Sequence, residues 1–223
     1  VLNDMLRVFG SRQIRNRATM GGNLVTASPI GDSAPCLLAL DAKVVLAKSP
    51  DEAGRAVSCA PSSNHRESGA HGVTHAASER IISIADFFVS YRKTALQPGE
   101  ILKTIIIPRG VSQPGRTRQA AWFKVSKRRE MDISTVAGAF VVDLDEQKII
   151  RHVRLGYGGV AATPARAMKT EAALLGKVWS EATIQNVLPV LQAEFTPISD
   201  VRGSAEYRSG LITSLLEKFY FDS

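Results

Sequence analysis

RATMGGNLVTASPIGD, residues 17–32, carries the most informative pattern in the chain. Its two adjacent glycines have no Cβ, so they allow a tight turn and a close approach of the backbone to a bound group. Backbone amides beside such a turn, with hydroxyl side chains nearby, form a cradle that suits phosphate oxygens. The stretch therefore predicts either a phosphate-binding loop or an ordinary glycine turn with a polar rim.

Composition is that of an ordinary soluble globular protein, with 223 residues that are 44% hydrophobic and 22% charged. No apolar run approaches the roughly 20 residues that span a bilayer, and no signal peptide is present, so we expect no membrane association. The first residue is not methionine, so we expect a fragment or a processed piece. Cys36 and Cys59 form neither a metal-binding nor a disulfide pattern, which indicates a reducing, cytoplasmic location.

The net charge is +7, and basic residues cluster within 12–17 and 124–129. Such clusters are typical of solvated faces, and also of sites for nucleic acid, an anionic cofactor or an acidic partner. No aromatic residues are interleaved for base stacking, so we expect no nucleic-acid binding.

The spacing of apolar residues predicts an N-terminal part with two helices and three strands. One helix is expected over 2–9, ending at Gly10, and the other over 36–40. The strands are expected over 43–47, 81–84 and 101–107, and a helical turn is expected at 85–89. Between them, residues 48–79 are rich in Ser, Gly, Pro and Ala and are expected to form a mobile surface excursion. Its three histidines, at 65, 71 and 75, lack metal-ligand spacing, so no metal site is expected.

A Pro/Gly/Arg linker over 110–119 predicts a boundary between two domains, 1–109 and 116–223. The second domain is expected to contain a three-stranded meander over 120–126, 134–143 and 148–157. Three helices should follow, opening at Pro164, Ser180 and about Ser204, with Pro189 kinking or breaking the second.

Four motifs together resemble the FAD domain of the molybdenum hydroxylases, the family of xanthine dehydrogenase, which the chain most resembles. They are ATMGGNLVTASPIGDSAP (18–35), FFVSYRKTALQPGEIL (87–102), FKVSKRREMDIS (123–134) and LGYGGVAATPARA (155–167). The resemblance implies an α+β fold. It consists of the second part of an FAD domain of the p-cresol methylhydroxylase (PCMH) type, then a small three-stranded antiparallel sheet with helices like the CO dehydrogenase flavoprotein C-terminal domain.

The resemblance also implies ten FAD-binding residues. Phe9 matches an aromatic position that packs on adenine, Val25 and Leu102 match aliphatic residues that press on the isoalloxazine, and Lys124 matches a lysine that contacts the flavin. The pyrophosphate segment is matched by Thr19, Gly22, Asn23, Thr26, Ser28 and Asp32. A first pyrophosphate segment would precede Val1. No catalytic side chain is expected, because the flavin carries the chemistry.

By this resemblance the chain takes electrons from 2Fe-2S clusters to FAD, which passes hydride to NAD. The clusters and the molybdopterin are expected on other segments or subunits, in a hetero-oligomer. Two alternatives stay open. One is the flavoprotein of another family member, such as a carbon monoxide, nicotinate or aldehyde dehydrogenase. The other is a cofactor-free interaction domain of the same fold.

Overall fold

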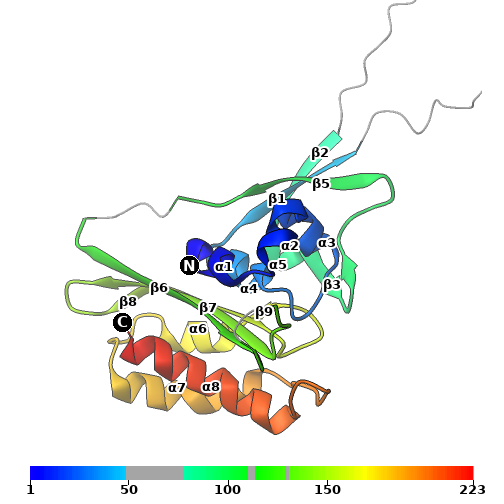
Figure 1. Cartoon of the computed structure of the whole chain (residues 1–223). Coiled ribbons are helices and arrows are strands. Elements are labelled where there is room, and N and C mark those ends of the chain that lie inside the picture. The colour runs from blue at the N-terminus through cyan, green and yellow to red at the C-terminus, as the bar shows by residue number, and fades with distance from the viewer. Residues whose placement is uncertain (49–77, 110–113, 129–130, 223) are drawn as a thin grey trace, which may run out of the picture.

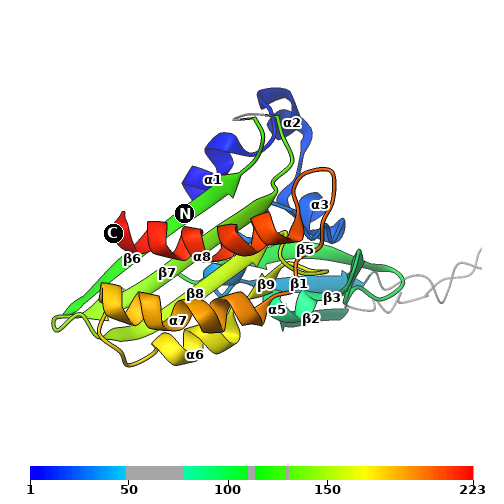
Figure 2. The same ribbon diagram turned by 90° about the horizontal axis from the view of Figure 1, so that it is seen from below.

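The computed structural model describes residues 1–48, 78–109, 114–128 and 131–222. Over these ranges the chain forms two main antiparallel sheets, one in each half, with helices around them (Figure 1). Helix α4 (Ser33–Ala39) lies between the two sheets, and α6, α7 and α8 cover the opposite face of the C-terminal sheet (Figure 2). Within the same ranges, no helix is both long and apolar enough to cross a membrane.

The N-terminal half is built from short elements around one three-stranded sheet of order β2-β1-β5. Besides α4, its elements are α1 (Leu2–Val8), α2 (Arg12–Arg17), α3 (Met20–Val25), β1 (Lys43–Lys48), β2 (Ser78–Ser83), α5 (Ile84–Phe87), β3 (Phe88–Ser90), β4 (Lys93–Thr94) and β5 (Glu100–Ile106). The central strand β1 buries its four inner residues, and Leu37 and Phe87 pack in the same core. The expected helices and strands of this half are present within a few residues of their predicted ends.

Helix α2 was not expected. Ser11 begins it by accepting a hydrogen bond from the backbone N–H of Ile14 at 3.2 Å, which satisfies one of the free donors of the first turn. The helix contains only one apolar residue, Ile14, which is half-exposed. No apolar periodicity could therefore predict this helix.

The C-terminal half is a four-stranded sheet of order β6-β7-β8-β9 with three helices on one face. Its elements are β6 (Arg116–Val125), β7 (Val136–Asp145), β8 (Ile150–Gly158), β9 (Ala165–Arg166), α6 (Met168–Leu174), α7 (Glu181–Glu194) and α8 (Ala205–Phe221). Strand β7 is buried on both faces because helices cover both sides of it. Phe140, Tyr157 and Phe219 form the aromatic centre of this core.

Two details of this half differ from the expectation. The helix predicted to open at Pro164 begins at Met168, because Ala165 and Arg166 pair with β8 as the two-residue strand β9. The meander therefore has a fourth, short strand. Helix α7 also continues through Pro189 without ending there.

Several sequence expectations fall outside the described residues. They concern the surface excursion predicted over 48–79 (except for its two ends), the three histidines in it, and residues 110–113 of the linker. The division into domains 1–109 and 116–223 stays a prediction. Among the described residues, no group of His, Cys, Asp or Glu is arranged to hold a metal ion.

Helix α4 approaches strand β8 closely because β8 carries glycine where the helix crosses it. A Cβ at Gly156 would collide with the backbone carbonyl of Pro35, and one at Gly158 would lie 3.1 Å from Pro35 Cγ. Cys36 and Ala39 of α4 pack with Ala139 of β7 in a small separate core. This contact fixes the two halves of the chain against each other.

The residue Asp41, just after α4, ties the helix to β8 and β9. His152 Nε2 lies 3.1 Å from its carboxylate, Arg154 Nε donates to it at 2.7 Å, and Arg166 Nη1 lies at 3.4 Å. Burial raises the pKa of Asp41, but hydrogen bonds from His152 and Arg154 outweigh this effect and lower it from 3.8 to about 2. Asp41 is therefore ionised at neutral and mildly acidic pH.

We expect Asp41 to make stability depend on pH in acid. Its folded-state pKa lies below the unfolded one, so its contribution is present above pH 4 and is lost as the pH falls toward 2. The side chain is 37% exposed, so after allowance for solvent screening we expect about 1 kcal/mol. Urea unfolding of Asp41→Asn between pH 7 and 2.5 should show a shallower loss of stability than the parent. Asp222→Asn, which removes an exposed carboxylate, should keep the parent's profile; equal slopes for Asp41→Asn and the parent would contradict the assignment.

Candidate functional site

The two glycines of the opening motif lie in the first turn of helix α3 and not in a separate turn. Thr19 caps this helix, because its Oγ1 accepts a hydrogen bond from the backbone N–H of Gly22 at 2.9 Å. The expectation of a tight glycine turn is therefore wrong in its local geometry. Glycine at 22 leaves room for this cap, since a Cβ there would lie 2.9 Å from Thr19 Oγ1 and displace it.

The chain between α3 and α4 is held by its own polar groups. Thr26 Oγ1 donates to the carbonyl of Asn23 at 2.7 Å, and the hydroxyl of Ser33 donates to Asn23 Oδ1. Farther along, the backbone N–H of Gly159 donates to the carbonyl of Pro29 at 2.8 Å, which fastens this linker to the C-terminal half. In the described part of the chain the hydroxyl of Ser28 has no partner.

A buried ion pair joins the start of α4 to strand β6. Lys124 Nζ donates to Asp32 Oδ2 at 2.7 Å, and the two side chains are 8% and 11% exposed. The hydroxyl of Ser134, which is buried just before β7, donates to the other carboxylate oxygen of Asp32. These contacts satisfy both oxygens of the carboxylate and hold the lysine in one place.

A hollow of about 350 Å³, here called the Phe9 hollow, opens beside this pair. Its lining consists of Phe9, Gly10, Ile14, Asn23, Ser28, Ile30, Gly31, Asp32, Lys124, Met131, Asp132, Ile133 and Ser134. The backbone N–H groups of Arg128 and Ile133 donate to Asp132 and lower the pKa of its carboxyl. Polar and charged groups thus lie on one wall, and half-exposed Ile14 and Ile133 lie at the rim.

Five of the ten sequence-predicted residues line the Phe9 hollow: Phe9, Asn23, Ser28, Asp32 and Lys124. The other five lie on or against α3. Thr19 and Gly22 form its first turn, Val25 and Thr26 lie at its end, and Leu102 of β5 packs beside it. Val25 is 41% exposed, and Leu102 Cδ2 would lie 3.6 Å from a Cβ at Gly21.

Ser134 and the apolar rim of the hollow were missed by sequence reasoning. A single serine before a strand gives no local signal, and its role depends on Asp32, which is 102 residues away in sequence.

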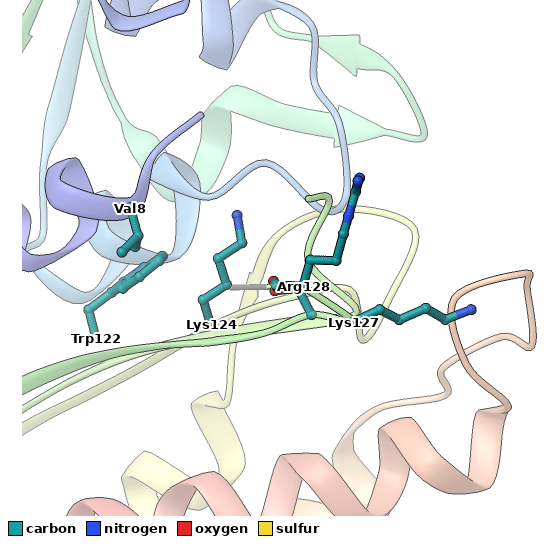
Figure 3. Close-up of a pocket in the computed structure, with 6 residues that line it drawn as sticks. Val8, Trp122, Lys124, Lys127 and Arg128 are labelled. Carbon is teal, nitrogen blue, oxygen red and sulfur yellow. The ribbon is translucent and has the colours of Figure 1, made fainter. Parts of the chain in front are cut away.

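A second hollow, of about 310 Å³, lies next to the ion pair and is called the Trp122 hollow. It is lined by Val8, Trp122, Lys124, Ser126, Lys127 and Arg128 (Figure 3). Lys124 lines both hollows and so forms the wall that they share. Arg129, which belongs to the same basic cluster, lies outside the described residues.

Two family models match the chain. Residues 1–58 match the model described as the FAD binding domain in molybdopterin dehydrogenase, and residues 121–222 match the CO dehydrogenase flavoprotein C-terminal domain.

Among curated proteins, the chain is 36% identical over 219 residues to nicotinate hydroxylase of Emericella nidulans, covering 96% of this chain. It is 35% identical over 222 residues to xanthine dehydrogenase of Blastobotrys adeninivorans, and 33% over 220 residues to xanthine dehydrogenase/oxidase of Gallus gallus, each covering 97% of this chain. The chain spans 14% of the length of each of these relatives.

Among solved structures, carbon monoxide dehydrogenase from Hydrogenophaga pseudoflava is similar in fold. Its matching chain gives a TM-score of 0.79 at 24% identity, over 98% of this chain and 64% of that one. A Cu,Mo-CO dehydrogenase in its cyanide-inactivated form gives a TM-score of 0.77 at 25% identity, over 98% and 65% of the two chains.

We expect the Lys124–Asp32 pair to dominate the local energetics. Lys124→Met leaves a buried carboxylate without its cation, so the free energy of unfolding should fall by about 3–5 kcal/mol. Asp32→Asn should also lower the free energy of unfolding, because it leaves the buried ammonium group of Lys124 without its carboxylate. The double variant should lose at least about 1 kcal/mol less of this free energy than the sum of the two single losses. Urea unfolding measures all three.

The control is Lys103→Met, which breaks the exposed ion pair of Lys103 with Glu79 and should cost less than about 1 kcal/mol. Additive losses for Lys124→Met and Asp32→Asn would show that the two buried groups do not interact.

Proposed function

Because this chain belongs to the FAD-binding domains of the molybdenum hydroxylase family, we propose that it forms the electron-transferring flavin portion of a larger oxidoreductase most similar to xanthine dehydrogenase. The observation that carries this proposal is the Phe9 hollow. There an aromatic ring, an unpaired hydroxyl and a buried cation from segments far apart in sequence line one cavity inside the family-matched region.

The residues present fit a flavin nucleotide. Gly31 keeps the polar wall open, since a Cβ there would lie 3.3 Å from the carbonyl of Ser28 and 3.7 Å from Asn23 Oδ1. Ser28 has a hydroxyl proton to give to an anion, whereas Thr26 uses its own within α3. The wall therefore offers hydrogen-bond donors and the rim offers apolar surface, as a ligand with phosphates and flat rings requires.

Each predicted residue has a defined part in this proposal. Phe9 packs on the adenine end, and Ser28 and Asn23 face the pyrophosphate. Thr19 and Gly22 shape the start of α3, and Thr26 closes its end. Val25 and Leu102 exclude water from the ring system, and Lys124 supplies positive charge beside it.

The position of Lys124 changes one part of the expected role. Its ammonium group is not free, because Asp32 neutralises it at 2.7 Å. Asp32 accepts hydrogen bonds from both Lys124 and Ser134, so its part is to hold the lysine and not to contact phosphate.

Bound FAD would supply the redox chemistry. It would accept electrons from iron–sulfur clusters and pass them to NAD as hydride. In our proposal the 2Fe-2S clusters and the molybdopterin belong to other segments or subunits, and the assembly is cytoplasmic. A nicotinate hydroxylase is the alternative that a specific observation favours, because one such enzyme is 36% identical to this chain. The oxidised substrate would be selected by the molybdenum segment.

Purification of the full-length protein tests the proposal directly. We expect a yellow protein that contains one flavin together with iron and molybdenum, and whose flavin is reoxidised by NAD. A colourless, metal-free protein that forms complexes with other proteins would instead be a cofactor-free interaction domain of this fold.

Gly22→Val should abolish flavin retention. The branched side chain would displace the Thr19 hydroxyl and disturb the first turn of α3, where the cap now satisfies the Gly22 N–H. The control is Gly21→Ala, whose added Cβ would meet only Leu102 at ordinary contact distance and should leave flavin content unchanged. Flavin absorbance per protein decides between them, and equal flavin in Gly22→Val and the parent would remove this turn from the site.

Lys124→Met should lower the reduction potential of the bound flavin. The substitution removes a cation and leaves the carboxylate of Asp32 uncompensated, so negative charge on the reduced ring becomes less favourable. A charged hydrogen bond is worth about 1.5–3 kcal/mol, which is about 30–60 mV for two electrons.

Leu102→Ala, by contrast, should open the flavin to water and raise its reactivity with oxygen without removing a charge. Redox titration measures the first effect, and an unchanged midpoint in Lys124→Met would place that lysine away from the flavin.

A further inference from the structure

Three cationic side chains, those of Lys124, Lys127 and Arg128, line the Trp122 hollow. Arg128 Nη2 donates to the carbonyl of Met131 at 3.1 Å and lies 4.0 Å from Asp132. Lys127 Nζ donates to the carbonyl of Val201 at 2.9 Å, which is an uncharged acceptor, and in the described ranges it has no carboxylate partner. Lys124 is balanced by Asp32 and Arg128 faces Asp132, so of the three cations that line the hollow Lys127 is the one without a carboxylate partner in the described ranges.

Donors remain available in this hollow. The Arg128 side chain is 72% exposed, and its guanidinium uses only one of its nitrogens in a close hydrogen bond. Figure 3 shows its side chain and that of Lys124 extending to the same side of the sheet, while Lys127 extends away toward another loop. A guanidinium and an ammonium on one side of a cavity match the oxygens of a phosphate group.

The indole of Trp122 adds an independent observation. Its Nε1 is buried and has no hydrogen-bond partner among the described residues, which is unusual for a buried donor. Figure 3 shows the ring beneath Val8 and beside Lys124, so an apolar wall adjoins the cationic one. A bound anion that draws Trp122 slightly outward would satisfy this donor.

We propose that the Trp122 hollow binds a phosphate dianion, either free or carried by a small ester such as a mononucleotide. Arg128 and Lys124 contact the phosphate, Trp122 Nε1 donates to it, and Val8 covers an attached ring. The volume of about 310 Å³ is at the lower end for small-molecule pockets, which suits a phosphate or a small phosphate ester. The site is separate from the flavin site of the proposed function and is divided from it by Lys124.

Isothermal titration calorimetry of the full chain with inorganic phosphate and with AMP tests the proposal. We expect one site per chain and affinity that falls as salt is raised. Tighter binding of AMP identifies an ester as the ligand, because it adds contact with the apolar wall, whereas equal affinity identifies free phosphate. Flavin content is recorded on the same preparation, so loss of flavin without loss of phosphate binding counts against the proposed function alone.

Two variants test the location by different means. Arg128→Gln removes the most available donor and should weaken phosphate binding at least tenfold. Val8→Phe fills the hollow without changing its charge and should also weaken phosphate binding at least tenfold. Lys148→Gln is the matched control, because it removes one positive charge at a hollow elsewhere on the molecule and should change affinity less than twofold. Circular dichroism confirms that each variant is folded.

Three results would overturn the proposal. The first is no binding of phosphate or AMP at millimolar concentration. The second is binding that Arg128→Gln and Val8→Phe leave unchanged. The third is one-for-one displacement of phosphate by FAD, which would assign this hollow to the flavin site.

Discussion

Helix α4 can lie between the two sheets only because β8 has no side chains where the helix crosses it. Gly156 and Gly158 let the backbone near Pro35 approach the strand, and all seven residues of the helix are buried as a result. That close contact brings an aspartate at each end of α4 to the C-terminal sheet. Asp32 reaches Lys124 at one end, and Asp41 reaches the arginines of β8 and β9 at the other.

The buried pair of Lys124 and Asp32 also decides what kind of electrostatic environment the site provides. A lone buried lysine would create a strong positive field, but a lysine bonded to a carboxylate creates mainly a dipole. The hydroxyl of Ser134 directs that dipole by holding the second oxygen of Asp32. The effect of Lys124 on a nearby group therefore depends on three side chains that come from three different parts of the chain.

Much of the fold could be predicted because its signals are local. The apolar spacing that defines α8 and the buried run that defines β1 are visible within a few residues. The flexibility of the glycine pair predicts a turn, but the hydroxyl of Thr19, three residues before Gly22, caps a helix there instead. Strand β9 was missed because two residues form no periodic pattern and are ordered only by pairing with β8.

The candidate site was predictable only where it lies within one motif. The types and order of the residues from Thr19 to Asp32 predict a cofactor segment, and their roles stay a prediction. The contact of Asp32 with Lys124 joins residues 92 positions apart and depends on sheet packing, so no local pattern could predict it. Lys124 is also the partition between two hollows, and this gives the molecule a thermodynamic property. If both cavities bind ligands as proposed, a ligand that pulls the ammonium group toward one side weakens its hold on the other, and the two ligands are then linked. Such linkage is reciprocal, and each occupant must change the affinity of the other by the same factor.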